Sequence, residues 1–150
     1  MRVIGLRRLK DERGSYMVEF AIVAFLFSIV LFGIFELGRM VLVYTTVANS
    51  ARVGARYAIV HGGFRTGSGS TGPSGPGSTT EIETVVKNFA GAGLLDPSRL
   101  TINVTYPDGD NAAGHAVNVS VTYPYDPFIR YFNSPLSVTL GSTSRGVITF

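Results

Sequence analysis

Residues 16–35 read YMVEFAIVAFLFSIVLFGIF, an apolar run of twenty positions in which Glu19 is the one charged residue. At about 1.5 Å of rise per helical residue the run reaches about 30 Å, the thickness of one hydrocarbon core. It is rich in Phe, Leu, Ile and Val, and it has no proline to interrupt a helix. The run therefore predicts one transmembrane helix, and the lipid bilayer is its expected surroundings.

A short basic tail precedes this run. Five positive side chains stand against two negative ones there, a difference of plus three: Arg2, Arg7, Arg8, Lys10 and Arg13 against Asp11 and Glu12. Arginines also follow the run but are more widely spread: Arg39, Arg52, Arg56 and Arg65. Because dense positive charge favours the cytoplasmic side, we expect a cytoplasmic N-terminus and a C-terminal part outside the cytoplasm.

Glu19 is out of place in an apolar run, since an ionised carboxylate in lipid costs on the order of 3 kcal/mol or more. Either it lies at the membrane surface in contact with water, or it requires a positive partner. Gly14 and Ser15 suggest that partner, because glycine leaves the backbone unhindered for a protease, and a cut after Gly14 creates an amine at Ser15. Glu19 is then one helical turn away on the same face. These residues predict a cleaved leader, residues 1–14.

This junction resembles a class III signal, the kind that prepilin peptidases cut in type IV pilins and their relatives. Such signals are similar to Gly14 followed by a glutamate at the fifth position of the mature chain, where Glu19 stands. In pilins this glutamate is thought to meet the N-terminal amine of an adjacent subunit during assembly. The resemblance implies processing at Gly14 and Ser15 by a prepilin peptidase, and an assembly contact at Glu19.

A more specific resemblance is carried by three motifs: Val18-Glu19-Phe20-Ala21, Glu36-Leu37-Gly38-Arg39 and Ala51-Arg52-Val53-Gly54-Ala55-Arg56-Tyr57-Ala58. Together they look like the TadE-like family over residues 13–60. That family comprises minor pseudopilins of the tight adherence (Tad, or Flp) pilus system, with an N-terminal membrane helix and a small exported domain. The resemblance implies a single-pass protein of the bacterial inner membrane. It also implies other pilins or pseudopilins and Tad inner-membrane assembly proteins as partners.

Residues 36–60 carry information of their own. Glu36 and Arg39 are spaced to pair on one helical face, and Arg52 and Arg56 share another. Small residues form a stripe that permits close approach of another helix: Ala48, Ala51, Gly54, Ala55 and Ala58. The alternative is a solvated, alanine-rich helix end. Because no helix breaker stands between Ser15 and Val60, we expect one helix over residues 15–60, with its second half as a stalk beyond the membrane.

The composition changes after Val60. His61-Gly62-Gly63 predicts the helix end, and residues 67–80 are almost wholly Gly, Ser, Thr and Pro, so residues 61–80 are expected to form a flexible linker or exposed loop. Residues 67–72 match G-x-G-x-x-G. No apolar strand precedes this match and Pro73 follows it, so a nucleotide site is not expected there.

Residues 81–150 predict a small exported α+β domain, with one helix and an antiparallel sheet of three to four strands. Apolar residues at helical spacing indicate a helix over residues 81–92, with Thr80 at its start and Gly93 after it. Two runs of period-two alternation, residues 100–106 and 116–123, flank turn residues 107–110 and predict a hairpin. Two more short strands are expected at residues 136–140 and 145–150.

This domain of about 70 residues would have a marginal core, and the chain has no cysteine for a disulfide. It is therefore expected to depend on its stalk or on partner subunits. The aromatic segment at residues 123–132 either closes the edge of the core or forms a partner-binding patch.

No catalytic or cofactor pattern is found. His61 and His115 lack neighbouring ligands for a metal, and Asp108 and Asp110 fit a turn better than a calcium loop. The net charge of +3 comes mostly from the tail and the stalk, which is not a nucleic-acid footprint. We therefore expect no enzyme, no metal and no cofactor.

The sequence as a whole predicts a membrane-anchored structural component in biogenesis of a Tad pilus, which serves adhesion or secretion. The alternative is a single-pass protein whose exported domain binds a ligand or a surface. A conventional secretory signal peptide fits poorly, because the apolar stretch is too long and the nearest small-x-small site, residues 48–50, lies far beyond it.

Overall fold

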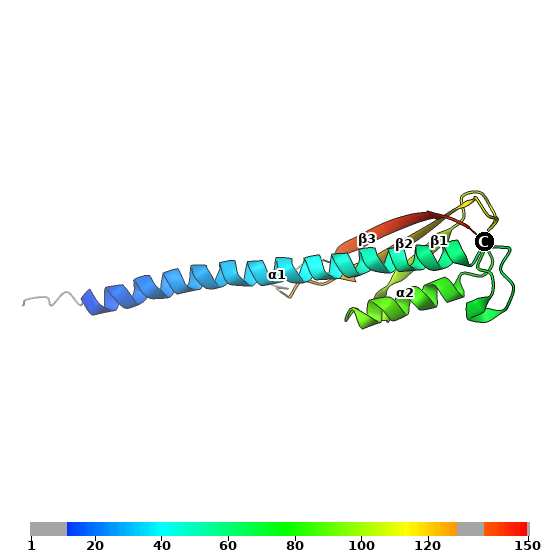
Figure 1. Ribbon diagram of the computed structural model, residues 1–150. Helices are drawn as coiled ribbons and strands as arrows, with labels where there is room; N and C mark the ends of the chain where they lie inside the picture. Colours follow the sequence, from blue (N-terminus) through cyan, green and yellow to red (C-terminus); the bar gives the residue numbers. More distant parts are fainter. Residues whose placement is uncertain (1–11, 129–136, 150) are drawn as a thin grey trace, which may run out of the picture. The chain divides into compact units, whose positions relative to one another are not determined.

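The computed structural model describes residues 12–128 and 137–149, and it confirms the predicted α+β fold (Figure 1). Most of the expected leader and the second part of the aromatic segment lie outside these residues. In chain order the elements are helix α1 (Glu12–Val60), the 3₁₀ helix η1 (Gly69–Thr71), helix α2 (Thr80–Ala92), the 3₁₀ helix η2 (Pro97–Arg99), and strands β1 (Thr101–Thr105), β2 (Ala116–Tyr125) and β3 (Val138–Val147).

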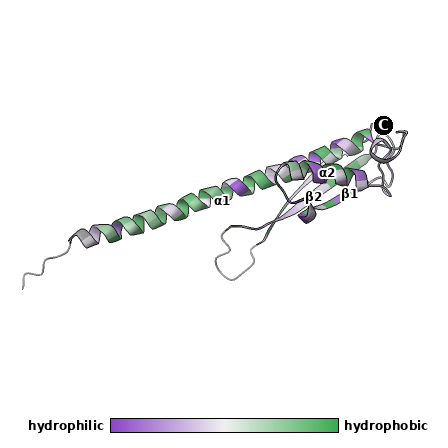
Figure 2. Ribbon diagram, turned by 90° about the horizontal axis from the view of Figure 1, so that it is seen from below, coloured by the Kyte–Doolittle hydropathy of each residue, from purple (hydrophilic) through white to green (hydrophobic). Residues whose placement is uncertain are grey.

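Helix α1 is shared by two compact units, one that ends at Leu37 and one that begins at Gly38. In the first unit nearly all of its described side chains are exposed, although most of them are apolar (Figure 2). Among the described residues, Gly14–Val60 is the one helical stretch long and apolar enough to cross a membrane, and none of its most apolar part is buried. None of the residues that the structure describes covers this apolar surface.

The core of the second unit lies between both helices and one face of the sheet. Its buried members come from α1, α2 and β2: Val47, Ala51, Ala55 and Ala58; Ile82, Val86 and Ala90; Val117, Val119 and Val121. The second half of α1, expected as a stalk, is therefore part of the folded domain. This helix supplies the apolar surface that residues 81–150 lack by themselves.

Strands β1, β2 and β3 form an antiparallel meander in that order. The predicted hairpin is confirmed, because residues 101–105 pair with residues 118–122 and the apolar side chains of β2 face the core. The intervening turn is held by Asp108, whose Oδ2 accepts the Ala116 amide at 2.7 Å, and by Gly109, whose φ is 86°. The outer face of the sheet is polar, as the hydroxyl contact of 2.7 Å between Ser120 and Thr143 illustrates.

The prediction of two separate short strands near the C-terminus is wrong. Strand β3 is continuous and pairs with β2 along its whole length, from Val138 opposite Tyr125 to Val147 opposite Ala116. Three of its four inward positions hold small residues, Ser142, Ser144 and Gly146, so the apolar alternation is hidden in the sequence. Gly146 shows the reason, since α1 approaches so closely that a β carbon there would overlap the Ile59 side chain.

Helix α2 matches its prediction with a shift of one residue at the start. Thr79, not Thr80, is the residue before the helix, and its hydroxyl contacts the Glu83 carboxylate at 3.1 Å. At the other end Gly93 follows the helix, as expected. The amides of Leu94 and Leu95 return to the carbonyls of Gly91 and Ala90, both at 3.1 Å, which closes the helix in a Schellman arrangement.

The segment at residues 61–80, expected as a linker, lies within the second unit. The Ser74 amide donates to the His61 carbonyl at 2.6 Å, and the Asn111 side chain donates to the Ser74 carbonyl at 2.9 Å. The Gly63 amide bonds the Asn111 carbonyl at 2.8 Å. These bonds hold the segment to the loop between β1 and β2.

Candidate functional site

The proposed processing junction lies at the start of α1. Gly14 and Ser15 are within the first turns of the helix, whereas the sequence placed the helix start at residue 15. The first turn of a helix leaves its amides without intrahelical partners, so it is the part most easily unwound for a peptidase. A β carbon at Gly14 would meet nothing within 4 Å, so this position is sterically open.

Glu19 is exposed on the apolar part of α1. Within residues 12–128 and 137–149, no hydrogen bond or ion pair to its carboxylate is found. Glu19 is therefore a charged residue on an apolar helix surface of membrane-spanning length. Its partner is not among the described residues. That Glu19 pairs with an N-terminal amine stays a prediction.

The motif at residues 51–58 divides into an inward and an outward face. Ala51, Gly54, Ala55 and Ala58 are buried in the core of the second unit. A β carbon at Gly54 would stand 2.5 Å from Val86 Cγ2 and 3.0 Å from Val119 Cγ1, so glycine is what allows α1, α2 and β2 to meet there. Packing within the chain therefore explains the stripe of small residues.

The two arginines of the same motif point the other way. Arg52 and Arg56 are exposed, and the printed contact of Arg52 is a 3.2 Å hydrogen bond to the Asn49 side chain on the same helix. They form a basic ridge on the face of α1 that the core leaves uncovered. A contact of these arginines with other subunits stays a prediction.

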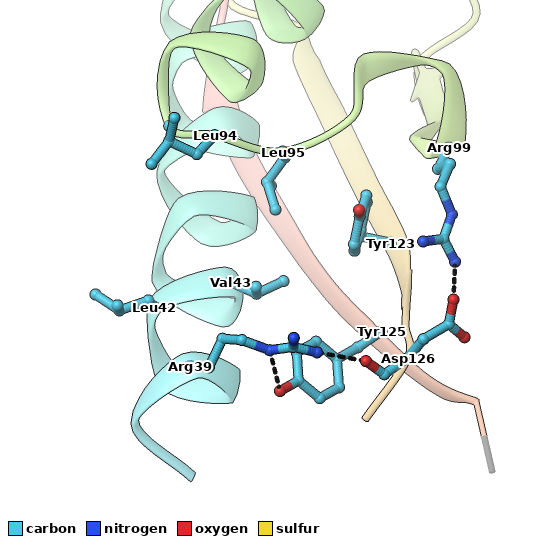
Figure 3. A pocket seen from close by; sticks show the side chains of 10 residues that line it. Arg39, Leu42, Val43, Leu94, Leu95, Arg99, Tyr123, Tyr125 and Asp126 are labelled. Carbon is cyan, nitrogen blue, oxygen red and sulfur yellow. Dashed lines mark hydrogen bonds and ion pairs between the residues drawn. The ribbon is translucent and has the colours of Figure 1, made fainter. Parts of the chain in front are cut away.

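Arg39 has a role that its spacing from Glu36 did not predict. Its Nε donates to the Tyr125 hydroxyl at 2.9 Å, and its Nη2 donates to the Asp126 carbonyl (Figure 3). The guanidinium also lies over the rings of Tyr125 and Phe128, at 4.8 and 5.7 Å from their centroids. Arg39 thus ties the middle of α1 to the end of β2. The predicted pair between Glu36 and Arg39 stays a prediction.

A pocket of about 440 Å³ opens beside Arg39, between α1, the segment that follows α2, and the end of β2. Its far wall holds Arg99, whose Nη2 donates to the Asp126 carboxylate at 2.7 Å and to the Pro124 carbonyl at 3.0 Å. The hydrogen bond that Arg99 donates to the Asp126 carboxylate raises the pKa of Arg99 above its ordinary value. Arg99 also lies 5.3 Å from the centroid of the Tyr123 ring.

Sequence reasoning missed this pocket because its parts are distant in the chain. Arg99 and Asp126 are 27 positions apart, and no local pattern links them. The aromatic segment was noticed, and the structure confirms that its first part closes the core, since Tyr123 and Tyr125 are buried. The exposed Phe128 ends the described part of that segment.

The two histidines do not form a metal centre. His61 is buried and stacks on Tyr57, with 3.8 Å between ring centroids, and its Nδ1 lies 2.8 Å from the Tyr57 carbonyl. His115 Nδ1 contacts the Asp110 carboxylate in the loop before β2. Within the two described ranges, no group of three or more His, Cys, Asp or Glu side chains is placed to hold a metal ion.

Fold and geometry define a class of protein: a chain with one N-terminal apolar helix of membrane-spanning length, which continues into the core of a small α+β domain. In the comparison with known families, a model described as TadE-like protein matches residues 14–56. This segment of the chain is similar to that family, and the match and the helix together fit a membrane-anchored component of the Tad pilus. No curated protein and no solved structure matches the chain.

Proposed function

We propose that this chain is a minor pseudopilin, a structural component in the biogenesis of a Tad pilus, and through it of adhesion or secretion. The TadE-like match supports this, because it begins at Gly14, the residue after which the leader would be cut, and covers the apolar run. The uncovered apolar surface of α1 supports a membrane anchor. In this proposal the chain is the substrate of an enzyme and acts structurally.

The observation that carries the proposal is Glu19, exposed on an apolar helix and without a partner in the described residues. Cleavage after Gly14 by a prepilin peptidase creates an ammonium group at Ser15. In the assembled pilus, the amine of an adjacent subunit pairs with Glu19, and both charges are neutralised in lipid. Arg52 and Arg56 offer a second, extramembrane contact to acidic groups on other pilins, pseudopilins or Tad inner-membrane assembly proteins.

The test is the pair of substitutions Glu19→Gln and Glu81→Gln in cells that assemble the pilus. Glu81 is a carboxylate on α2, outside the matched segment, and serves as the matched control. We expect mass spectrometry to find residues 1–14 removed from both variants. Pilus assembly should fall strongly for Glu19→Gln and stay at the wild-type level for Glu81→Gln.

Two results would contradict this proposal. An intact mass that still includes Met1 or Arg2 would exclude processing after Gly14. Normal piliation with Glu19→Gln would exclude the assembly contact and leave the helix as an anchor alone.

The pocket beside Arg39 favours a second candidate function, a single-pass protein whose outer domain binds a ligand or a surface. The volume of about 440 Å³ falls within the range of small-molecule sites. If this second candidate is correct, Glu19→Gln leaves the function intact, whereas substitution of residues that line the pocket abolishes the function.

A further inference from the structure

Strand β3 is an edge strand, and half of its backbone groups point away from the sheet. The Ile148 amide donates to the His115 carbonyl at 2.9 Å, so Ile148 and every second residue before it bond towards β2. The alternate residues point the other way, and among them the Thr149 amide donates to the Ile59 carbonyl at 3.0 Å. Within residues 12–128 and 137–149, no hydrogen bond to the outward backbone groups of the others is found: Thr139, Gly141, Thr143, Arg145 and Val147.

This edge lacks the usual protection. Natural edge strands are commonly short, or they carry proline, a bulge or an inward-pointing charge. Strand β3 has ten residues in unbroken register with β2, and it has no proline and one charged residue, Arg145. The opposite edge strand, β1, has five residues. Because the outward residues of β3 are all exposed, this strand is open to main-chain pairing with another extended chain.

Helix α1 runs alongside β3 in the same direction. Near the C-terminal end of the helix, a β carbon at Gly146 would overlap the Ile59 side chain. At the other end of the strand, Val138 is paired with Tyr125, whose hydroxyl accepts the hydrogen bond from Arg39. These contacts place residues 39–59 of α1 along the whole length of β3.

Two exposed arginines of α1 lie on the flank of the helix next to this edge. Arg52 precedes Ile59 by seven positions, about two helical turns, so both residues lie on one face of α1. Arg56 is within one turn of Ile59, towards the solvent side. The opposite flank meets α2, since a β carbon at Gly54 would be 2.5 Å from Val86 Cγ2. Figure 1 accordingly shows β3 and α2 on opposite sides of α1.

The charge beside this edge is all positive. Arg145 is exposed on the outer face of β3, while Arg52 and Arg56 stand on the side of α1. Residues 38–60 and 137–149 contain no Asp or Glu. Charge complementarity therefore selects an added strand with acidic side chains. A second copy of the chain does not supply them, because neither of its edge strands, residues 101–105 and 138–147, has an acidic residue.

We propose that the free edge of β3 binds an extended acidic segment of another protein, which adds a fourth strand to the sheet. The backbone of this segment bonds to the outward residues of β3, and carboxylates on its inner face meet Arg52 and Arg56. The inference rests on the proposed contact of these arginines with acidic groups, and it adds the place and the mode of binding. It does not involve Gly14 or Glu19.

The test uses the full-length chain in detergent micelles and a synthetic peptide of about ten residues, the length of β3, in which glutamate alternates with threonine. The matched peptide has glutamine in place of glutamate, and fluorescence anisotropy of the labelled peptides measures binding. We expect the acidic peptide to bind, less tightly as salt rises, and the glutamine peptide to bind about tenfold more weakly. Equal binding of the two peptides would overturn the acidic occupant.

Main-chain pairing is tested with the same acidic peptide methylated on its backbone nitrogens. One version is methylated at the glutamates and the other at the threonines, so each version blocks one edge of the extended peptide. We expect one version to bind and the other to lose binding, because only one edge of the peptide faces β3. Binding by both versions, or by neither, contradicts strand addition.

The two arginines are tested in the chain itself. Arg52→Gln combined with Arg56→Gln should weaken binding of the acidic peptide about tenfold. Lys87→Gln, which removes an exposed cation on α2, is the control and should leave binding unchanged. Unchanged binding without the two arginines would overturn their role, as would an equal loss with Lys87→Gln.

The place of binding is tested by disulfide capture. The chain has no cysteine, so Val147→Cys and Thr101→Cys place single thiols on β3 and on β1, and the acidic peptide carries a cysteine at each end. We expect capture at position 147 and none at position 101. Capture at position 101 that equals or exceeds capture at position 147 would overturn the assignment to β3. That result leaves cleavage after Gly14 and the assembly contact of Glu19 unaffected, since piliation tests those separately.

Discussion

Helix α1 contains two regions with opposite surroundings. In the unit that ends at Leu37, large side chains such as Phe20, Phe32 and Phe35 are exposed. In the unit that begins at Gly38, small side chains such as Ala51 and Ala55 are buried. The apolar surface of the first region requires lipid or another subunit to cover it. The small residues of the second region are covered by α2 and the sheet of the same chain.

The difference shows that the small residues at positions 51–58 serve the folding of the second unit. A stripe of small residues suits close packing of helices wherever they meet, in a membrane or in a domain core. Here Gly54 sits against Val86 and Val119 of its own chain, so the small residues serve the fold. Glu19, Arg52 and Arg56 are exposed on the same helix and take no part in that packing.

The largest expected effect on stability comes from substituting a glycine of α1, and two glycines of this helix compare the two regions. Gly54→Val places methyl groups where Val86 and Val119 already lie, and overpacking should cost about 3 kcal/mol and lower Tm by about 15 °C. Gly33→Val, where a β carbon meets nothing within 4 Å, should leave stability unchanged. Thermal unfolding of the full-length chain in detergent micelles, followed by circular dichroism, measures both. Equal effects would refute the contrast between the regions.

A smaller effect is expected from two tyrosines. Tyr125→Phe removes the hydroxyl that accepts the Arg39 hydrogen bond at a buried position, and should cost about 1 kcal/mol. Tyr16→Phe changes an exposed hydroxyl in the first region and should cost nothing measurable. The same unfolding assay compares them. No loss for Tyr125→Phe would show that Arg39 does not hold α1 to β2.

The smallest expected effect is on the pH dependence of stability, and it should come from a loop of the second region. The Ala112 amide and the His115 side chain lower the pKa of Asp110 below its ordinary value of 3.8. Because the folded pKa is lowered, the stabilising contribution is present above pH 3.8 and is lost as pH falls through the folded pKa. Stability measured against pH should therefore decline less steeply in this acid range for Asp110→Asn. An unchanged slope would exclude a contribution from this loop.

The sequence alone determined the features that depend on local pattern. An apolar run of twenty residues predicts a helix of membrane length, period-two alternation predicts the hairpin of β1 and β2, and residues 107–110 predict the turn. The family resemblance also came from residues close in the chain, and the match over residues 14–56 confirms it.

Only the tertiary structure decided the features that depend on residues far apart. It placed the second half of α1 in the core, joined two expected strands into β3, and brought Arg39, Arg99 and Asp126 around one pocket. The physical reason is the close approach of backbones. Where Gly54 and Gly146 let a helix come near, neighbouring positions require small side chains, and these lack the hydrophobic signal from which burial is predicted.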